Sequence, residues 1–357
     1  MSYSRRKAFY ASGKRYRAPG HTYSTVLGSV AELEREGWLS GHRVEPHNLG
    51  WQSSFWATPD LIEAADRLAS VLIFQAGEPI RLKDGARNLV DYPETLKTLR
   101  LRKALEPINA RLNELKIEVP GAIPEGRHLR VGDAYILPVP GNGLHRVFNR
   151  GSFACGGRAF GWWQNIPKTA RSNLLIDGQA TAEADYTALH ATILYDEQGI
   201  NFVGDPYDID SFPREHIKAG FNIAVNASSR RSAVYALANR IGEDRSYASR
   251  ILASIERRHE PIRRAFCSDA GMRLMRIDSE LILRALKAAN DNGIPALPVH
   301  DALIAPAQFI NQVAEIMVEA FTTVIGRVNS CQIKIKGIKV PHMGEGTGPG
   351  AFLPRAA

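Results

Sequence analysis

Two segments of the sequence, EADYTALHATILY (183–195) and PVHDALIAP (298–306), decide the fold that we expect. The first contains an alternation of apolar residues over 180–186, which predicts a β-strand closing on an acidic residue, Asp185. A helical apolar pattern over 188–198 follows directly. We therefore expect a strand that presents Asp185 near its carboxyl end, just before a helix.

The second segment predicts a β-hairpin with an acid at its turn. Two short apolar runs, 294–299 and 302–305, flank His300 and Asp301, and such runs around a tight turn are typical of paired strands. If this hairpin shares a sheet with the strand that ends near Asp185, the two carboxylates converge. Alone, each aspartate also fits an ordinary helix cap or turn residue.

The composition predicts a globular protein with a polyanionic partner. The chain has 357 residues, 44% of them hydrophobic, and 45 Lys+Arg against 37 Asp+Glu, for a formal net charge of +8. An excess of positive charge favours nucleic acid through counterion release, although many basic proteins bind nothing acidic. The three cysteines lie far apart in the sequence, which suggests neither a disulfide framework nor a CxxC zinc site.

No run of about 18 apolar residues suggests a membrane span. With no apolar signal segment at the amino terminus either, we expect a cytoplasmic protein without a membrane partner. No feature of the sequence indicates an oligomeric state.

The remaining pattern predicts further helices and short strands. Helices are expected over 61–74, 92–115 with a break near Pro107, 212–241, 247–264, 280–290 and 307–325, and strands over 146–148, 173–176 and 332–340. The helix over 92–115 carries Arg100, Arg102, Lys103 and Arg111, which suit either a nucleic-acid backbone or a solvated face.

A loop-rich stretch over 120–143, rich in proline and glycine, marks the expected domain boundary. Residues 1–143 are predicted to form a mostly helical, basic region that is thumb-like or binds nucleic acid. Residues 144–340 are predicted to form the main domain, and residues 341–357 a flexible tail. The basic, aromatic residues 1–25 fit either an arm lying on phosphates or a frayed terminus.

Two converging aspartates suit one particular chemistry. Transfer of a nucleotide to a hydroxyl uses two divalent ions about 3.5–4 Å apart. Mg²⁺ prefers oxygen ligands and keeps several waters, so Asp185, Asp301, one backbone carbonyl and substrate oxygens are sufficient to hold the pair.

Four segments resemble, in order, the motifs of family-A DNA polymerases and the related single-subunit phage-type RNA polymerases. The segment at 183–195 resembles motif A, in which a strand closes in Asp185, and the segment at 298–306 resembles motif C with its His300–Asp301 pair. Similar short chains look like uncharacterised proteins of bacterial genomes and mobile elements. The resemblance covers about residues 145–330.

The helix between the two aspartates resembles motif B. Arg214, Lys218 and Asn226 in PREHIKAGFNIAVNAS take the places of its arginine, its lysine and the characteristic residue beyond. Residues four apart lie on one face of a helix, so Arg214 and Lys218 can together hold a triphosphate.

The segment GGRAFGWWQNIP (156–167) resembles the sequence that precedes motif A in bacterial replicative-repair polymerases. The resemblance implies that Arg158 lies near the primer end or the incoming phosphates. It also implies that Gln164 and Asn165 lie near primer or template, and that His300 supports the turn or the primer end.

The resemblance as a whole implies a right-hand polymerase palm of α+β class, with an antiparallel sheet, reduced helical fingers and a helical thumb-like N-terminal region. It implies a template-directed nucleotidyltransferase, a minimal DNA polymerase acting on a DNA primer–template with nucleoside triphosphates. Two Mg²⁺ or Mn²⁺ ions would be held by Asp185, Asp301 and the Tyr186 backbone carbonyl.

The chain departs from the family pattern in ways that keep alternatives open. Ala302 follows Asp301 where the DNA polymerases have Glu, and His190 stands where they place a Glu that closes the ribose pocket. Asn222 and Asn226 replace residues that often stack on the nascent pair. An RNA polymerase or sugar-tolerant enzyme, and a catalytically silent nucleic-acid-binding protein, are therefore the rival readings.

Overall fold

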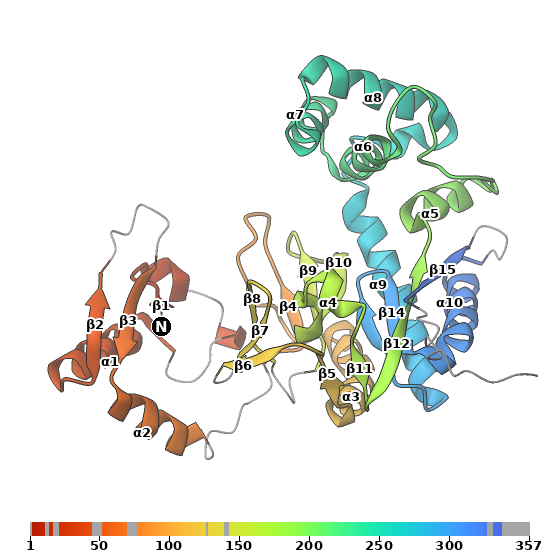
Figure 1. Cartoon of the computed structure of the whole chain (residues 1–357). Coiled ribbons are helices and arrows are strands. Elements are labelled where there is room, and N and C mark those ends of the chain that lie inside the picture. The colour runs from red at the N-terminus through yellow and green to blue at the C-terminus, as the bar shows by residue number, and fades with distance from the viewer. Residues whose placement is uncertain are drawn as a thin grey trace, which may run out of the picture.

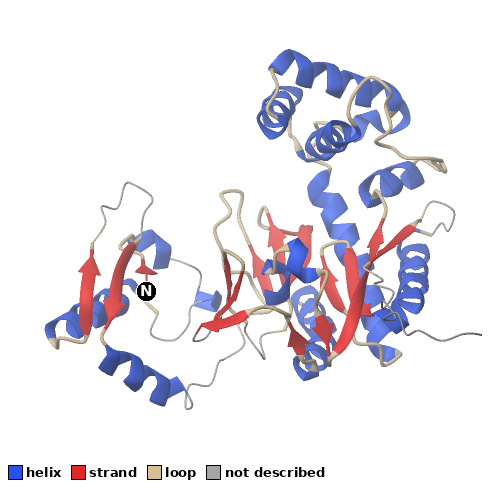
Figure 2. Ribbon diagram, viewed as in Figure 1, coloured by secondary structure: helices blue, strands red, loops and turns tan. Residues whose placement is uncertain are grey.

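The computed structural model describes residues 2–10, 14–16, 21–44, 52–69, 77–125, 128–138, 143–326 and 331–337. The chain forms a mixed α+β structure that combines mainly antiparallel sheets with many helices (Figure 1, Figure 2). The fold class agrees at this level with the expectation from the sequence. Within the described ranges, no helix has the length and apolar character needed to cross a membrane. The tail expected over 341–357 lies outside the described residues.

A six-stranded antiparallel sheet carries Asp185 on one strand and Asp301 in the turn between two others. Its strands are β5 (Ile117–Glu118), β11 (Leu175–Ile176), β12 (Gln179–Tyr186), β13 (Leu297–Val299), β14 (Ala302–Pro306) and β15 (Ile333–Lys336). The order is β13-β14-β12-β11-β5, and β15 pairs with β12. The strand that carries Asp185 and the hairpin around His300–Asp301 are therefore confirmed as elements of one sheet.

Two long helices pack with this sheet and with each other, α9 (Gly271–Asp291) and α10 (Ile310–Ile325). All five residues of β14 are buried, which explains why this strand reads as a continuous apolar run instead of an alternation. Helix α9 is much longer than the expected 280–290. Its first half carries several charged residues whose partners come from other elements, so the apolar pattern there is interrupted.

Three helices form a helical unit joined to the sheet region through α9, drawn above it in Figure 1: α6 (Arg214–Asn226), α7 (Arg230–Ile241) and α8 (Arg245–Arg258). The expectation of one helix over 212–241 is wrong. Ala227 is extended, and the Ser229 hydroxyl accepts a hydrogen bond from the Ser232 N–H and begins α7 as its N-cap. The break lets α7 fold back onto α6 and α8.

The helix expected over 247–264 is also shorter, because α8 ends at Arg258 and a 3₁₀ helix over Glu260–Ala265 follows. Helix α5 (Leu189–Glu197) follows β12 directly, as expected from the sequence. These elements share one hydrophobic core with the large sheet.

A smaller sheet lies next to the large one and is built on a hairpin of β9 (His145–Asn149) and β10 (Ser152–Phe160). Strand β4 (Ile80–Leu82) joins it in parallel with β9. A 3₁₀ helix over Trp162–Asn165 and α4 (Lys168–Arg171) then lead to the large sheet. This hairpin contacts α9 extensively.

The N-terminal region is mixed in structure, which corrects the expectation that residues 1–143 are mostly helical. Strands β1 (Ser2–Tyr3), β2 (Leu39–Arg43) and β3 (Ser53–Ala57) form a sheet with α1 (Tyr23–Arg35) and α2 (Pro59–Ala69) nearby. Tyr3, Val30 and Phe55 make a small core of their own. In contrast, buried residues from Ile80 to Ile136 belong to the main core.

The stretch 120–143 also differs from the expected loop. It holds a three-stranded antiparallel sheet of β6 (Ile123–Glu125), β7 (His128–Val131) and β8 (Ala134–Ile136). These strands are too short for their alternation to stand out among the surrounding prolines and glycines.

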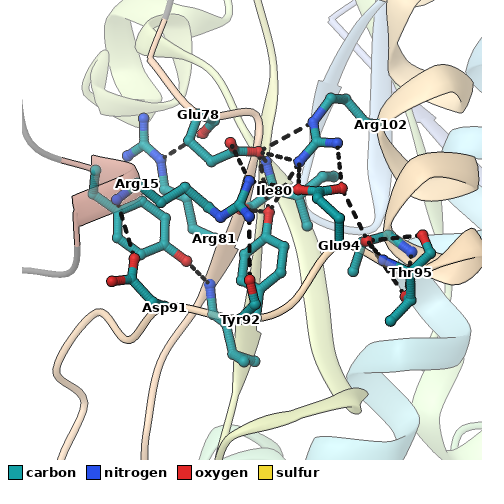
Figure 3. Close-up of polar contacts among 12 residues, drawn as sticks. Arg15, Glu78, Ile80, Arg81, Asp91, Tyr92, Glu94, Thr95 and Arg102 are labelled. Atoms are coloured by element: carbon teal, nitrogen blue, oxygen red, sulfur yellow. Dashed lines mark hydrogen bonds and ion pairs between the residues drawn. The ribbon is translucent and has the colours of Figure 1, made fainter.

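Helix α3 (Leu96–Glu114) runs without a break, although it contains Pro107. Leu101, Leu105, Ile108 and Leu112 are buried at helical spacing, and their packing outweighs the hydrogen bond that proline removes. On the same helix, Arg102 pairs with Glu78 and Glu94 instead of facing an open surface (Figure 3). Arg15 pairs with the same two glutamates and so ties the N-terminal segment to α3.

Candidate active site

Of the two aspartates singled out in the sequence, Asp185 lies near the end of β12 and Asp301 lies in the turn that joins β13 to β14, the strand next to β12. Asp185 of β12 is in register with Ala302 of β14, and the Tyr186 N–H donates to the Asp301 carbonyl at 3.3 Å. Opposed residues in antiparallel strands have Cα atoms about 4.5–5.5 Å apart. The two carboxylates border the same cavity, and the charge of Asp301 contributes to the raised pKa of Asp185.

The backbone around the two carboxylates is strained at two positions. His300, the first residue of the two-residue hairpin turn, has φ 56°, and Ala188, which precedes α5, has φ 49°. The left-handed region costs a non-glycine residue about 1–2 kcal/mol. Strain of this kind concentrates at functional sites, where the surrounding structure holds it in place.

A cavity of 580 Å³ gathers most of the predicted site residues. Its lining includes Arg158, Asp185, Tyr186, His190, Arg214, Lys218, Asn222, Asn226, His300 and Asp301, together with Lys168, Tyr207, Met275, Lys334 and Lys336. Residues from several separate parts of the chain thus meet in one place. We call this space the carboxylate cavity.

One wall of the carboxylate cavity is a single face of α6. Arg214, Lys218, Asn222 and Asn226 follow one another at intervals of four residues and all line the cavity. Arg214 pairs with Asp205 and Glu215, whereas within the described ranges no ion pair involves Lys218. The Asn226 amide donates to the Asn222 carbonyl at 2.8 Å.

Lys336 of β15 pairs directly with Asp185 and also with Glu183, at 3.1 Å from the latter. Burial raises the pKa of Asp185, and the nearby Asp301 charge adds to this, while the hydrogen bond from Lys336 opposes it. Lys334 lines the same cavity. The IKIK alternation could have indicated that both lysines share one face of the strand, but sequence reasoning did not use it.

A fully buried carboxylate, Asp278 of α9, was also missed. Arg158 reaches it with Nε at 3.1 and 3.2 Å from its two oxygens, and His190 Nε2 lies 3.1 Å from one of them. Burial tends to lower the pKa of Arg158, but the hydrogen bond and charge of Asp278 outweigh it and raise that pKa. Asp278 therefore holds two predicted site residues in place, and nothing in its helical sequence pattern reveals that it is buried.

His300 lines the carboxylate cavity next to Asp301. Burial lowers its pKa, and the Arg158 charge lowers it further. Its ring lies edge-on to Phe160 with centroids 6.4 Å apart. The neutral ring can therefore act as a hydrogen-bond partner at neutral pH.

Gln164 and Asn165 do not line the carboxylate cavity. They border a separate cavity of 450 Å³. The Gln164 amide donates to the carbonyls of Ala159 and Pro298, at 3.1 and 2.9 Å. Gln164 thus contacts Pro298 in β13, the strand that leads into the His300–Asp301 turn.

The donor set fits a pair of hard divalent cations. Asp185 and Asp301 supply carboxylate oxygens, and Tyr186 borders the same cavity. No group of three or more His, Cys, Asp or Glu side chains suited to a metal occurs in the described part of the chain. Backbone, water and substrate oxygens must then complete each shell, which is usual for Mg²⁺.

Comparison with known proteins adds a weak structural similarity. No family model matches the chain, and no curated protein matches it. Among solved structures, the polymerase domain of Pol1 from M. smegmatis, in complex with DNA primer-template and dNTP, matches with a TM-score of 0.37 and 14% identity. The match covers 76% of this chain and 59% of that one. At this TM-score, the similarity assigns neither a fold nor an activity.

Proposed function

We propose that the chain is a template-directed nucleotidyltransferase, specifically a minimal DNA polymerase that extends a primer. The observation that carries the proposal is the arrangement of the carboxylate cavity. Asp185 on β12 and Asp301 in the turn before the adjacent strand β14 border the same space as a helix face carrying Arg214 and Lys218. Paired carboxylates and nearby cations are what a triphosphate and its metal ions require.

In this proposal Asp185, Asp301 and the Tyr186 carbonyl hold two Mg²⁺ or Mn²⁺ ions. When bound, the ions supply Lewis acidity that activates the primer 3′ hydroxyl and neutralises charge on the leaving pyrophosphate. Lys336 pairs with Asp185 and neutralises its charge. This ion pair must break for the ions to bind.

Lys218 and Arg214 are proposed to hold the triphosphate. Arg214 would exchange its contact with Asp205 for phosphate oxygens, and this exchange costs little because the arginine side chain is 49% exposed. Asn222 and Asn226 lie farther along the same face and would contact the sugar or base.

The nucleic acid is proposed to approach from the side of β9 and β10. Arg158, oriented by Asp278, and His300 would contact the primer end, and Gln164 and Asn165 would lie near primer or template. We also propose that the palm and fingers begin near residue 77, because residues from Ile80 onward belong to the main core. The unit before it would be the accessory or thumb-like domain.

Primer extension tests this proposal. Asp185→Ala and Asp301→Ala should each abolish incorporation of labelled dNTP on a primed DNA template, because each removes a ligand of the ions. The matched control is Asp291→Ala, an exposed aspartate whose partner is Lys287, which should retain wild-type extension. Circular dichroism should show all three variants folded. Continued extension by either cavity variant would disprove the metal roles.

One observation favours a sugar-tolerant enzyme as the second candidate. The Asp278 carboxylate only accepts hydrogen bonds, so His190 Nε2 donates to it. Nδ1 is then the ring nitrogen that remains to contact a ribose 2′ hydroxyl. Separate dNTP and NTP pools in the same assay distinguish the two candidates, and no incorporation from either pool would instead indicate a silent binding protein.

A further inference from the structure

The 450 Å³ cavity next to the carboxylate cavity has the chemistry of a nucleotide subsite. Its lining combines cations, rings and amides: Arg81, Lys83, His145, Phe160, Trp162 and Gln164 are among its residues. We call it the second cavity. Its volume lies within the range usual for small-ligand sites, about 300–1,000 Å³.

The second cavity carries positive charge without a compensating acid in its lining. Arg81 is the central residue of β4 and Lys83 follows the strand directly, and no acidic side chain lines the cavity among the described residues. The Arg81 Nε donates to the backbone carbonyl of Glu78 (Figure 3). The Glu78 carboxylate is itself taken up by Arg15 and Arg102. The two cations are therefore available to an anionic ligand.

The rings of the second cavity provide surfaces for stacking. His145 and Phe160 are stacked with centroids 5.8 Å apart, and Trp162 is only partly buried. Burial, together with the charges of Arg81 and Lys83, lowers the pKa of His145 to about 4. The imidazole is therefore neutral at pH 7, so the positive charge of the cavity comes from Arg81 and Lys83.

Gln164 adds an acceptor that is not satisfied within the chain. Both partners of its amide nitrogen are carbonyls, so the orientation of the amide is determined by its hydrogen bonds. The Gln164 Oε1 atom is buried and has no partner in the described structure. Buried acceptors usually find a donor, and the N–H groups on the edge of a nucleobase are suitable donors.

We propose that the second cavity binds one unpaired nucleotide of a polynucleotide strand. Arg81 and Lys83 hold its phosphates, Trp162 or Phe160 stacks on its base, and Gln164 accepts from the base edge. Phe160 connects this cavity to His300 of the catalytic hairpin, and Gln164 connects it to Pro298. A strand that passes through the carboxylate cavity can therefore continue here. The proposal rests on the proposed function and adds to it a binding site for the nucleic-acid strand beside the carboxylate cavity.

The test measures binding of a fluorescein-labelled single-stranded deoxythymidine oligonucleotide by anisotropy, with EDTA present. Because EDTA removes the metal ions, the assay reports binding alone and does not depend on catalysis. Failure of this subsite can therefore be told apart from failure of the proposed polymerase activity. The Arg81→Gln/Lys83→Gln double variant should weaken binding at least tenfold. It should also reduce the slope of log K against log salt by about 1.4, at roughly 0.7 per lost contact with single-stranded phosphate.

The ring is tested separately. Trp162→Ala should weaken binding about 5- to 150-fold without changing the salt slope, since base stacking carries no charge, and Trp162→Phe should restore most of the affinity. The charge-matched control is Arg284→Gln/Lys287→Gln, on exposed positions of α9 outside both cavities. Thermal unfolding checks that each variant is folded. If the glutamine variant is unfolded, Arg81→Lys, which keeps the charge, takes its place.

Two outcomes would overturn the proposal. If the cavity variants bind the oligonucleotide within twofold of the control, no strand uses the second cavity. If they lose binding of free thymidine monophosphate but keep the oligonucleotide affinity, the cavity binds a mononucleotide and not a strand.

Discussion

At the scale of single residues, the carboxylates depend on partners that are remote in sequence. Asp185 is paired with Lys336, and Arg158 and His190 are both held by Asp278. A buried aspartate with an arginine and a histidine around it is satisfied, so it orients these side chains without the large cost of an isolated charge. The site is thus organised by ion pairs as much as by the residues that would meet substrate.

Lys336 leads to a prediction about metal affinity. Lys336→Gln should tighten Mn²⁺ binding several-fold, because it removes an ammonium group that competes with the ion for Asp185. Electron paramagnetic resonance titration of free Mn²⁺ measures this directly, without any catalytic readout. The matched control is Lys287→Gln, which removes a lysine from the exposed Lys287–Asp291 pair and should leave Mn²⁺ affinity unchanged. Weaker binding by the Lys336 variant would mean that the lysine positions Asp185 instead of competing for it.

At the scale of elements, the helical unit depends on close contact between α6 and its neighbours. Gly220 lies in the middle of α6, and a Cβ there would be 2.8 Å from Ile255 Cδ1 and 3.0 Å from Ile251 Cγ2, both on α8. The glycine therefore lets α8 pack directly against the α6 backbone. The same packing holds the face of α6 that lines the carboxylate cavity.

Gly220→Val should destabilise the protein by about 1–3 kcal/mol, because the added methyl groups overpack the α6–α8 contact. The control is Gly28→Ala in α1, where nothing lies within 4 Å of the added Cβ. There the gain in helix propensity should stabilise by up to about 1 kcal/mol. Chemical denaturation measures both, and a Gly220→Val variant as stable as the wild type would show that α6 and α8 can separate at no cost.

At the scale of the whole molecule, buried neutral histidines make stability depend on pH. His259 is fully buried, and its ring contacts the Tyr195 hydroxyl and the Pro206 carbonyl at 2.9 and 2.8 Å. Burial lowers its pKa to about 4, and that of His145 is likewise lowered to about 4. Both rings stay neutral in the folded chain under conditions where an unfolded histidine, with a pKa of about 6.5, takes up a proton.

Stability should therefore fall as the pH drops from about 6.5 to about 4, since the unfolded state binds more protons in this window. Each histidine contributes a slope of up to about 1.4 kcal/mol per pH unit. Urea denaturation between pH 4.5 and 7 measures the slope. His145→Asn should reduce it by up to about 1.4 kcal/mol per pH unit, the share of one histidine, whereas His128→Asn, at an exposed position, should not. A slope unchanged by the first variant would assign the effect to other groups.

Several elements of the fold follow from local pattern. Periodicity correctly predicts the strand before Asp185, the hairpin around His300 and Asp301, and the helices α5 and α10. In each of these elements, the spacing of the apolar residues follows the face that is buried. Local pattern did not predict the break at Ser229, the continuation of α3 through Pro107 or the small sheet over 123–136. Each of these is decided by a cap or by packing against distant residues.

The same division holds for the candidate site. By itself, the sequence singled out the acids and cations of the site, through the resemblance of four segments, in order, to known motifs. Only the tertiary structure decided that Lys336 pairs with Asp185, that Asp278 orients Arg158 and His190, and that Gln164 and Asn165 border a different cavity. Contacts between residues tens of positions apart or more depend on how elements pack, and no local pattern encodes them.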